Sequence, residues 1–479
     1  MKTINIFLII LSLVFLHSCY EDDTTLEHID ISDIKISFDL KDTLRVEKNE
    51  LVKLSPIIEQ AIEGTPTEYE WVLSKGTFNM LANIWEYGDY EVISNEKDLE
   101  YAFSSIIRYK LRFSAKNKYG ASFHNFNIQI STPYTMGYFI LSEKENGKGT
   151  VSFYSKYTPE QIEAGKTEKW LYNCFNVNNP EMPMGGQPVD IDKRINQYFI
   201  CCSESKTIYV INKNSFELEA TITTNEYDGY KPTKMNVFDN NARAAVVTSE
   251  DGKLYEISLL EYFIFEESNI DAQEMTSIAY ERNAGYSSTS LVWDKGTHKI
   301  YNAFYYMYHG NNTKDVLLGQ KMLQYFSTNS NTFVFTESET VAGNYMMSYF
   351  SNSLSTHKGS FDFTNTNMTL THNAPCVVNN KYNSFNYAKD NKVFKWITST
   401  NSNVVLPESA FITLEKSNID ITYMVKSLHE DYIYIGAYEP TSSEDNKGHL
   451  YIYNADTGAL VEKHENVCGK PIEIFYKPD

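Results

Sequence analysis

The feature that most constrains the fold of this chain is a recurring unit of two short apolar strands joined by a tight polar turn. In one example, the run Tyr198–Cys202 passes through residues 203–206 into Thr207–Ile211. Such hairpins recur at intervals of roughly 40 to 55 residues, the spacing of four-stranded propeller blades. The sequence therefore predicts an all-β chain with a β-propeller of about seven blades over residues 134–479.

A ring of blades suits a chain with 36 tyrosines and 27 phenylalanines. Radial packing hides the sheet edges that a chain so rich in aromatic residues would otherwise expose. The last apolar segment, Pro471–Tyr476, stands apart as a single strand, and we expect it to pair with the first blade and close the ring. A pair of stacked sandwiches is the alternative architecture.

Residues 31–133 have a different pattern of short strands and turns. Tyr69, Trp71 and Leu73 alternate onto one face, which is typical of a sandwich strand with a buried tryptophan. Pro133 ends the pattern, because proline cannot donate to the ladder of a central strand. We therefore expect an immunoglobulin-like sandwich before the propeller.

The N-terminus has the pattern of a cleaved export signal. Lys2 supplies a positive charge, Ile4–Leu16 is an apolar stretch too short to span a bilayer, and the small residue Ser18 precedes Cys19. We expect residues 1–18 to be removed and Cys19 to carry acyl chains, which anchor an otherwise soluble protein. The alternative is a buried strand that happens to end in cysteine.

Three carboxylates, Glu21, Asp22 and Asp23, lie in the tether of residues 19–30 that follows the cysteine. Their position resembles the surface-export signal of lipoproteins from Bacteroidetes bacteria. The resemblance implies an outer-membrane protein that faces the medium. The alternative is that these residues only begin a solvated tether, because short acidic runs are common.

The balance of charge and the cysteine pattern exclude two classes of site. The net charge is −20 without a basic cluster, so nucleic acid is not an expected partner. The cysteines beyond Cys19 are widely scattered and fit neither a disulfide framework nor a zinc site. Cys201 and Cys202 are neighbours on one strand and should pack on its opposite faces.

Several local motifs together resemble the PKD-like lipoproteins of Bacteroidetes. They are, after the lipidation signal, Tyr69–Trp71, Ile93–Ser94, Lys97–Leu99, Leu111–Phe113, Asn117–Lys118, Thr132–Tyr134, Gly137, Ile140–Leu141, Gly469–Ile472 and Ile474–Tyr476. The resemblance covers the whole chain, but its motifs are structural and strongest from Trp71 to Leu141. It implies partners of one kind, a SusC-like TonB-dependent barrel and its SusD-like lipoprotein lid. It supplies no catalytic or ligand residues.

The usual catalytic signatures, including HExxH, GxSxG and the P-loop, are missing from the sequence. Asp190 and Asp192 share one side of a strand, a spacing that could hold calcium or divide acid and base roles. Arg194 follows on the same side, so a solvated, salt-bridged turn is the favoured interpretation. We expect no metal, no cofactor and no enzymatic activity.

The densest aromatic group beside a polar loop consists of Tyr305, Tyr306, Tyr308 and His309. Strand alternation places Tyr306 and Tyr308 on one side and Tyr305 on the other. One face could therefore be a platform for a sugar or a peptide. Packing in the core is the favoured interpretation, and ligand binding is the alternative.

The expected function is that of a surface-exposed, non-catalytic lipoprotein that binds a nutrient, a glycan or peptide, or docks on a SusC/SusD-type transporter. A hydrolase or lyase that cleaves a polymer before import is one alternative, and it needs paired carboxylates that converge in the propeller's central channel. A structural scaffold in an outer-membrane complex is another.

Overall fold

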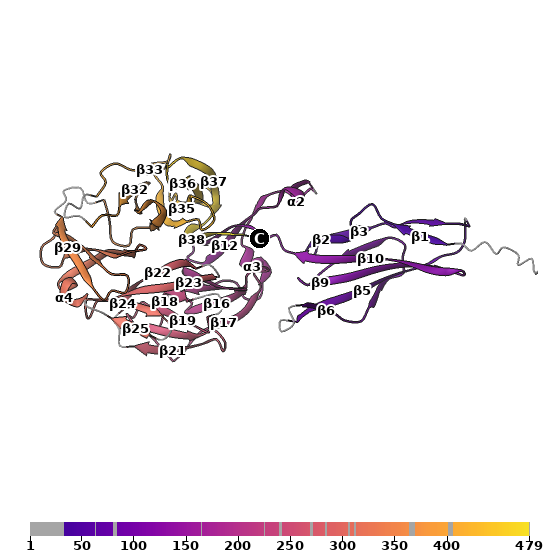
Figure 1. Ribbon diagram of the computed structural model, residues 1–479, viewed down its shortest axis with the longest axis horizontal. Helices are drawn as coiled ribbons and strands as arrows, with labels where there is room; N and C mark the ends of the chain where they lie inside the picture. The colour runs from indigo at the N-terminus through magenta and orange to yellow at the C-terminus, as the bar shows by residue number, and fades with distance from the viewer. Residues whose placement is uncertain are drawn as a thin grey trace, which may run out of the picture. The chain divides into compact units, whose positions relative to one another are not determined.

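The computed structural model describes residues 33–478, apart from residues 63, 80–83, 164, 225, 239–241, 269–271, 283–284, 305–306, 311–312, 364–368 and 401–405. The chain forms two compact units, which meet in sequence between Ser131 and Thr132. Both units are built almost wholly of β-strands (Figure 1). The expected all-β class is confirmed.

The N-terminal unit is a sandwich with ten strands in its described part. They are β1 (Ile34–Ser37), β2 (Thr43–Glu47), β3 (Leu51–Leu54), β4 (Ile57–Gln60), β5 (Glu68–Asn79), β6 (Ile84–Tyr87), β7 (Glu91–Ser94), β8 (Leu99–Ala102), β9 (Arg108–Asn117) and β10 (Gly120–Ser131). The largest sheet has the order β2-β10-β9-β5-β6, and β1 pairs with β4 and β3 with β8.

Trp71 on β5 is the centre of the sandwich core. Its side chain is fully buried, and its Nε1 donates hydrogen bonds to the carbonyl oxygens of Glu96 at 3.1 Å and Lys97 at 3.2 Å. Leu73 is buried in the same core, and Tyr69 packs against it, so the predicted face of this strand is confirmed.

The C-terminal unit contains seven four-stranded antiparallel sheets in its described part, the blades of a propeller. The first four blades are β38 (Lys470–Lys477), β11 (Gly137–Glu143), β12 (Gly149–Ser155) and β13 (Lys169–Leu171); β14 (Pro188–Arg194), β15 (Gln197–Cys202), β16 (Thr207–Asn212) and β17 (Leu218–Ile222); β18 (Pro232–Val237), β19 (Ala244–Ser249), β20 (Leu254–Ser258) and β21 (Phe263–Ser268); and β22 (Ala272–Arg282), β23 (Gly285–Asp294), β24 (Lys299–Phe304) and β25 (Met307–Gly310).

The remaining three blades follow in chain order. They are β26 (Gln320–Ser327), β27 (Thr332–Ser338), β28 (Tyr345–Phe350) and β29 (His357–Phe363); β30 (Cys376–Asn379), β31 (Ser384–Lys389), β32 (Lys392–Ile397) and β33 (Ile412–Thr413); and β34 (Asp420–Lys426), β35 (Tyr432–Tyr438), β36 (Gly448–Asn454) and β37 (Leu460–Cys468). Short helical segments lie in the connections between strands. They are α2 (Pro159–Glu163), α3 (Cys174–Asn178), α4 (Lys314–Leu317) and the 3-10 helix η1 (Asn380–Tyr382).

The last strand of the chain closes the ring. β38 pairs antiparallel with β11, Phe475 opposite Phe139 and Ile474 opposite Ile140, and so becomes the innermost strand of the first blade. In Figure 1 the yellow end of the chain at β38 accordingly reaches the blade that contains violet β12, with β11 between the two strands in the sheet. The expected closure by this segment is confirmed.

The blades pack face to face through apolar cores. Cys202 belongs to the core between the first and second blades, and Cys201 belongs to the core between the second and third. The two thiols therefore lie on opposite faces of β15, as strand alternation predicts. None of the helices in the described part of the chain has the length and apolarity of a bilayer-spanning helix.

Candidate functional site

The residues expected to direct lipidation and export lie outside the described residues. They are Cys19, Glu21, Asp22 and Asp23. The same holds for Tyr305 and Tyr306 of the expected aromatic platform.

The other half of that platform lies on the outermost strand of the fourth blade. Tyr308 pairs with Ala303 and His309 with Asn302 in the ladder of β25 and β24. Their place in the ladder identifies the strand but does not distinguish a core role from a ligand-binding role, so the platform stays a prediction.

Asp190 and Asp192 have a different environment from the expected solvated turn. Both lie on β14, the innermost strand of the second blade, and the side chain of Asp190 is only 3 % exposed. Asp190 Oδ2 accepts a hydrogen bond from the backbone N–H of Met235 at 2.7 Å, and Asp192 Oδ2 accepts one from that of Val237 at 2.5 Å. The two carboxylates therefore bridge the second blade to the third.

A cluster of charged side chains surrounds Asp190 near the axis of the ring. Lys234 on β18 forms an ion pair with Asp190 Oδ1 at 2.8 Å, and 36 % of the Lys234 side chain stays open to solvent. Glu473 on the closing strand β38 forms a side-chain hydrogen bond with Asp190, and Tyr423 on β34 forms one with Glu473. Carboxyl, ammonium and phenol groups thus come together from four innermost strands, β14, β18, β34 and β38.

The electrostatics of this axial cluster favour protonation of Glu473 and Asp192. Burial raises the pKa of Glu473 well above its ordinary value, and the negative charge of Asp190 raises it further. Burial also raises the pKa of Asp192 to about 7. Burial by itself lowers the pKa of Lys234, but the Asp190 and Glu473 carboxylates outweigh it and raise that pKa overall.

A pocket of about 270 Å³ opens at the end of the ring where the innermost strands finish. We call it the axial pocket. The ends of β14, β34 and β38 line it, together with the turn between β16 and β17 and the turn that follows β34. Its cationic side chains are Lys193, Arg194, Lys213, Lys426 and Lys477. No Asp or Glu is among its lining residues, although the chain as a whole carries a net charge of −20.

The cations of the axial pocket have different surroundings. Arg194 Nη1 donates to the carbonyl oxygen of Leu259 at 3.1 Å, so its guanidinium is directed to the third blade. The buried Lys477 Nζ donates to the carbonyl oxygen of Lys213 at 2.9 Å and to Asn214 Oδ1 at 3.1 Å, which fixes the turn that carries Lys213. In the described part of the chain neither Lys213 nor Lys426 forms an ion pair.

Charges of both signs surround Lys193. Burial lowers its pKa, the carboxylates of Asp192 and Glu473 oppose this effect, and the Lys213 ammonium adds a smaller lowering. The Lys193 ammonium also lies 5.7 Å from the centre of the Phe475 ring. Several cations that line one pocket beside an apolar wall provide a favourable site for an anion.

Aromatic side chains hold the wall of the axial pocket rigid. The Phe475 ring stacks on Phe139 with centroids 4.7 Å apart and packs at 5.2 Å against Tyr198. On the opposite rim, Ser427 Oγ accepts hydrogen bonds from the backbone N–H groups of His429 and Glu430, each at 3.3 Å. Contacts within the protein therefore fix both the rim and the wall of the pocket.

A second polar cluster joins the first blade to the seventh. Glu462 accepts a hydrogen bond from the Tyr138 hydroxyl at 2.9 Å and lies 2.6 Å from His464 Nε2. Burial alone would raise the pKa of Glu462, but His464, Lys156 and Tyr138 outweigh it and lower that pKa to about 2. Trp170 Nε1 donates a hydrogen bond to His464 Nδ1 at 3.2 Å. The polar groups of this cluster therefore bind one another between the two blades.

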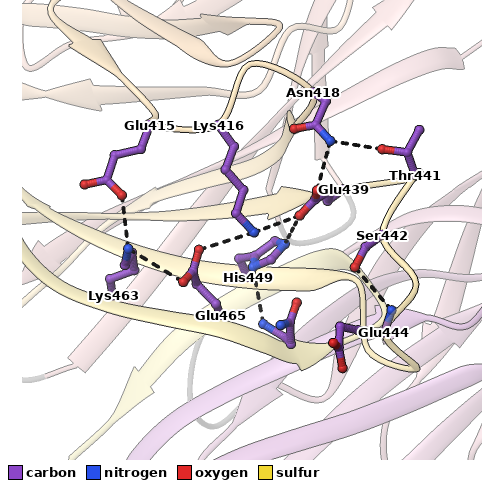
Figure 2. A network of polar contacts seen from close by, with 11 residues as sticks. Glu415, Lys416, Asn418, Glu439, Thr441, Ser442, Glu444, His449, Lys463 and Glu465 are labelled. Atoms are coloured by element: carbon purple, nitrogen blue, oxygen red, sulfur yellow. Dashed lines mark hydrogen bonds and ion pairs between the residues drawn. The ribbon is translucent and has the colours of Figure 1, made fainter.

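A third network lies on the seventh blade around the buried His449 (Figure 2). Figure 2 shows Lys416 between Glu439 and Glu465, at 2.8 and 3.4 Å, with His449 Nε2 3.7 Å from Glu439. Burial and the Lys416 charge lower the pKa of His449 to about 4, against the opposing effect of the two carboxylates. The ions here neutralise one another, unlike those of the axial pocket.

No group of His, Cys, Asp and Glu side chains in the described part of the chain could hold a metal ion. The cysteines described, Cys174, Cys201, Cys202, Cys376 and Cys468, are free thiols. Sequence reasoning missed the axial pocket because its cations come from segments far apart in the chain. Four of the five lie near the ends of innermost strands and Lys213 lies on a turn, a relation that is recognised only once the blades are placed.

Comparison with known proteins gives one family match. The model of the PKD-like family matches residues 19–188, a range that spans the sandwich and extends into the first strands of the propeller. No curated protein sequence matches the chain.

Solved structures of propeller proteins are similar in fold. A quinonprotein alcohol dehydrogenase-like protein from Bacteroides thetaiotaomicron has 14% identity and a TM-score of 0.47 over 92% of this chain and 99% of its own. BamB from Moraxella catarrhalis has 8% identity and a TM-score of 0.35 over 68% and 87%. At these values the similarities carry no conclusion about activity, ligand or partner.

Proposed function

We propose that this protein is a surface-exposed, lipid-anchored outer-membrane protein that binds a nutrient, without catalysing a reaction, for a SusC/SusD-type uptake system. The export signal before Cys19, the acidic residues after it and the PKD-like match over residues 19–188 support the location. Along the chain the sandwich lies between the lipidation site and the propeller, and the propeller carries the binding site.

The observation that carries the binding function is the axial pocket. It combines a concave volume, a rigid aromatic wall and several cations without a lining carboxylate. Small-molecule sites are concave and largely pre-formed, with a few convergent polar groups on apolar walls, and the axial pocket has these features. The carboxylates of the axial cluster, in contrast, are occupied by Lys234, by Tyr423 and by backbone N–H groups.

Membrane attachment is tested by changing Cys19 to Ala. Metabolic labelling with an alkynyl fatty acid should mark the wild-type protein and leave the variant unlabelled, and the variant should leave the membrane fraction. Cys468→Ala is the matched control, because Cys468 is buried in the propeller and should not affect labelling. Undiminished label on the Cys19→Ala variant would refute lipid attachment at this residue.

Surface exposure is tested by protease treatment of intact cells. The wild-type protein should be digested, and a variant with Glu21, Asp22 and Asp23 all changed to Ala should be protected. Resistance of the wild type, when a known surface protein is digested in the same cells, would show the opposite orientation.

The transporter partnership is tested by affinity capture of the full-length protein from native outer membranes. Enrichment of a TonB-dependent barrel and its lipoprotein lid is expected. Capture of neither component after chemical cross-linking, at native expression levels, would refute the uptake role.

A hydrolase or lyase remains a second candidate, and one observation favours it. Asp190 and Glu473 converge beside the ring axis, as a pair of acid and base groups would. The test is incubation of the full-length protein with polysaccharides, measuring new reducing ends. Release that disappears in Asp190→Asn would establish catalysis and refute the non-catalytic proposal.

A further inference from the structure

We infer that the axial pocket recognises an acidic sugar, through a carboxylate or sulfate group held by Lys193, Lys213 and Lys426. This inference rests on the proposed binding function and names the chemistry of the ligand. It locates the ligand where strands of the first, second and seventh blades end, on other blades than Tyr308 and His309.

Charge is the first step of the argument. The chain has 20 more acidic than basic side chains, yet the pocket walls contain five Lys or Arg and no Asp or Glu. In the described part of the chain neither Lys213 nor Lys426 forms an ion pair, so both ammonium groups can approach an anion. A bound oxyanion would be attracted to these cations across an apolar wall.

The positions of the lysines are the second step. Lys213 lies on a turn whose carbonyl oxygen accepts from the buried Lys477 ammonium at 2.9 Å, so its backbone is fixed. Lys426 ends β34 on the facing rim, where it also lowers the pKa of the neighbouring Asp431, whose carboxylate is already paired with Lys381. Lys193 lies near the end of β14. An oxyanion in the pocket can therefore meet donors from two strands and a turn.

Size and wall chemistry are the third step. The volume of about 270 Å³ lies near the lower limit of ligand pockets, roughly 300 to 1,000 Å³, which suits one or two sugar rings better than a folded chain. Phe475 and Tyr476 supply apolar walls for the faces of a ring, whereas a bare inorganic anion would leave them without contact. Cationic side chains beside apolar walls therefore favour a ligand that is a sugar with an acidic group.

The experiment is isothermal titration of the full-length protein with D-glucuronate, D-glucose, an acidic dipeptide and inorganic sulfate. D-glucuronate should bind and D-glucose should bind at least tenfold more weakly, because the two differ at the group that the lysines contact. Higher ionic strength should weaken the binding of D-glucuronate. Equal affinity for the two sugars would overturn the inference.

Variants of the pocket lysines locate the site. Lys213→Met and Lys426→Met should each weaken D-glucuronate binding about tenfold. Lys470→Met is the matched control, because Lys470 is exposed at the opposite end of β38, and it should leave binding unchanged. Thermal melting of all three variants verifies that they fold. Unchanged affinity in folded Lys213→Met and Lys426→Met would overturn the assignment of the site.

The remaining outcomes separate this inference from the proposed function. Sulfate that binds as tightly as D-glucuronate, or an acidic dipeptide that binds when the sugar does not, overturns the sugar class. If no probe binds but native membranes still yield the transporter with this protein, the inference is refuted and the uptake role is kept.

Discussion

His449 should make the propeller sensitive to acid, and the change His449→Gln should remove that sensitivity. The imidazole is fully buried on β36, and its Nδ1 accepts a hydrogen bond from the backbone N–H of Asn466 at 3.2 Å. Folding therefore holds the ring neutral. Glu439, Glu465, Lys416 and Lys463 face it, and their charges partly cancel.

The magnitude follows from the difference between the folded and unfolded pKa values. Burial lowers the pKa of His449 to about 4, while an unfolded histidine titrates near about 6.5. Between these values the unfolded chain binds more protons, so the free energy of unfolding decreases as the pH falls from about 6.5 to about 4. At about 1.4 kcal/mol per pKa unit, the loss at pH 4 is about 3 kcal/mol.

The assay is urea denaturation of the full-length protein at pH 7 and at pH 4, following the transition of the propeller. The free energy of unfolding of wild type relative to His449→Gln should fall by about 3 kcal/mol between the two pH values. Asp192 acts in the opposite sense, because its raised pKa makes stability fall as the pH rises from about 4 to about 7. Comparing two proteins that both contain Asp192 cancels its contribution.

The exposed His357 provides the control, since His357→Gln should follow wild type at both pH values. A pH dependence of His449→Gln equal to that of wild type would refute the account of His449 as a buried neutral base.

Three other perturbations test the account of the fold by thermal or chemical denaturation. Asp190→Ala should lower the free energy of unfolding by about 3 to 5 kcal/mol, since it leaves Lys234 without its buried partner. The control Glu415→Gln, in an exposed pair with Lys463, should lower it by less than about 1 kcal/mol. Equal losses in the two variants would contradict the burial argument. Trp71→Ala should destabilise the sandwich by about 3 to 5 kcal/mol, and a smaller loss would mean that the core reorganises. Gly137→Ala should also destabilise the propeller, because φ is 148° there and a Cβ would collide with the carbonyl of Tyr154; a neutral outcome would show that the start of β11 can shift.

Local patterning predicted much of the fold. The period-two alternation of Tyr69, Trp71 and Leu73 identified the core face of β5, and the neighbouring Cys201 and Cys202 pack on opposite faces as expected. The isolated final strand closes the first blade because it has no local partner and an apolar face to bury. Each of these inferences uses neighbours in sequence.

The axial cluster could not be predicted in the same way. Glu473 Oε2 meets the backbone N–H of Ile191, 282 positions earlier in the chain, only because β38 completes the ring. Asp190 and Asp192 appeared typical of a solvated turn, since two acids and an arginine on one side of a strand usually face water. Asp190 is buried and Asp192 is partly buried because β14 is the innermost strand of its blade, a position that depends on the closed ring.

The central claim, that the ligand site lies at the axis of the propeller, is tested most directly by hydrogen–deuterium exchange of the full-length protein with and without D-glucuronate. Bound sugar should slow exchange in three segments that line the axial pocket, residues 193–195, 425–429 and 475–477. Slower exchange confined to residues 301–310, or no change in any segment at saturating sugar, would contradict the claim.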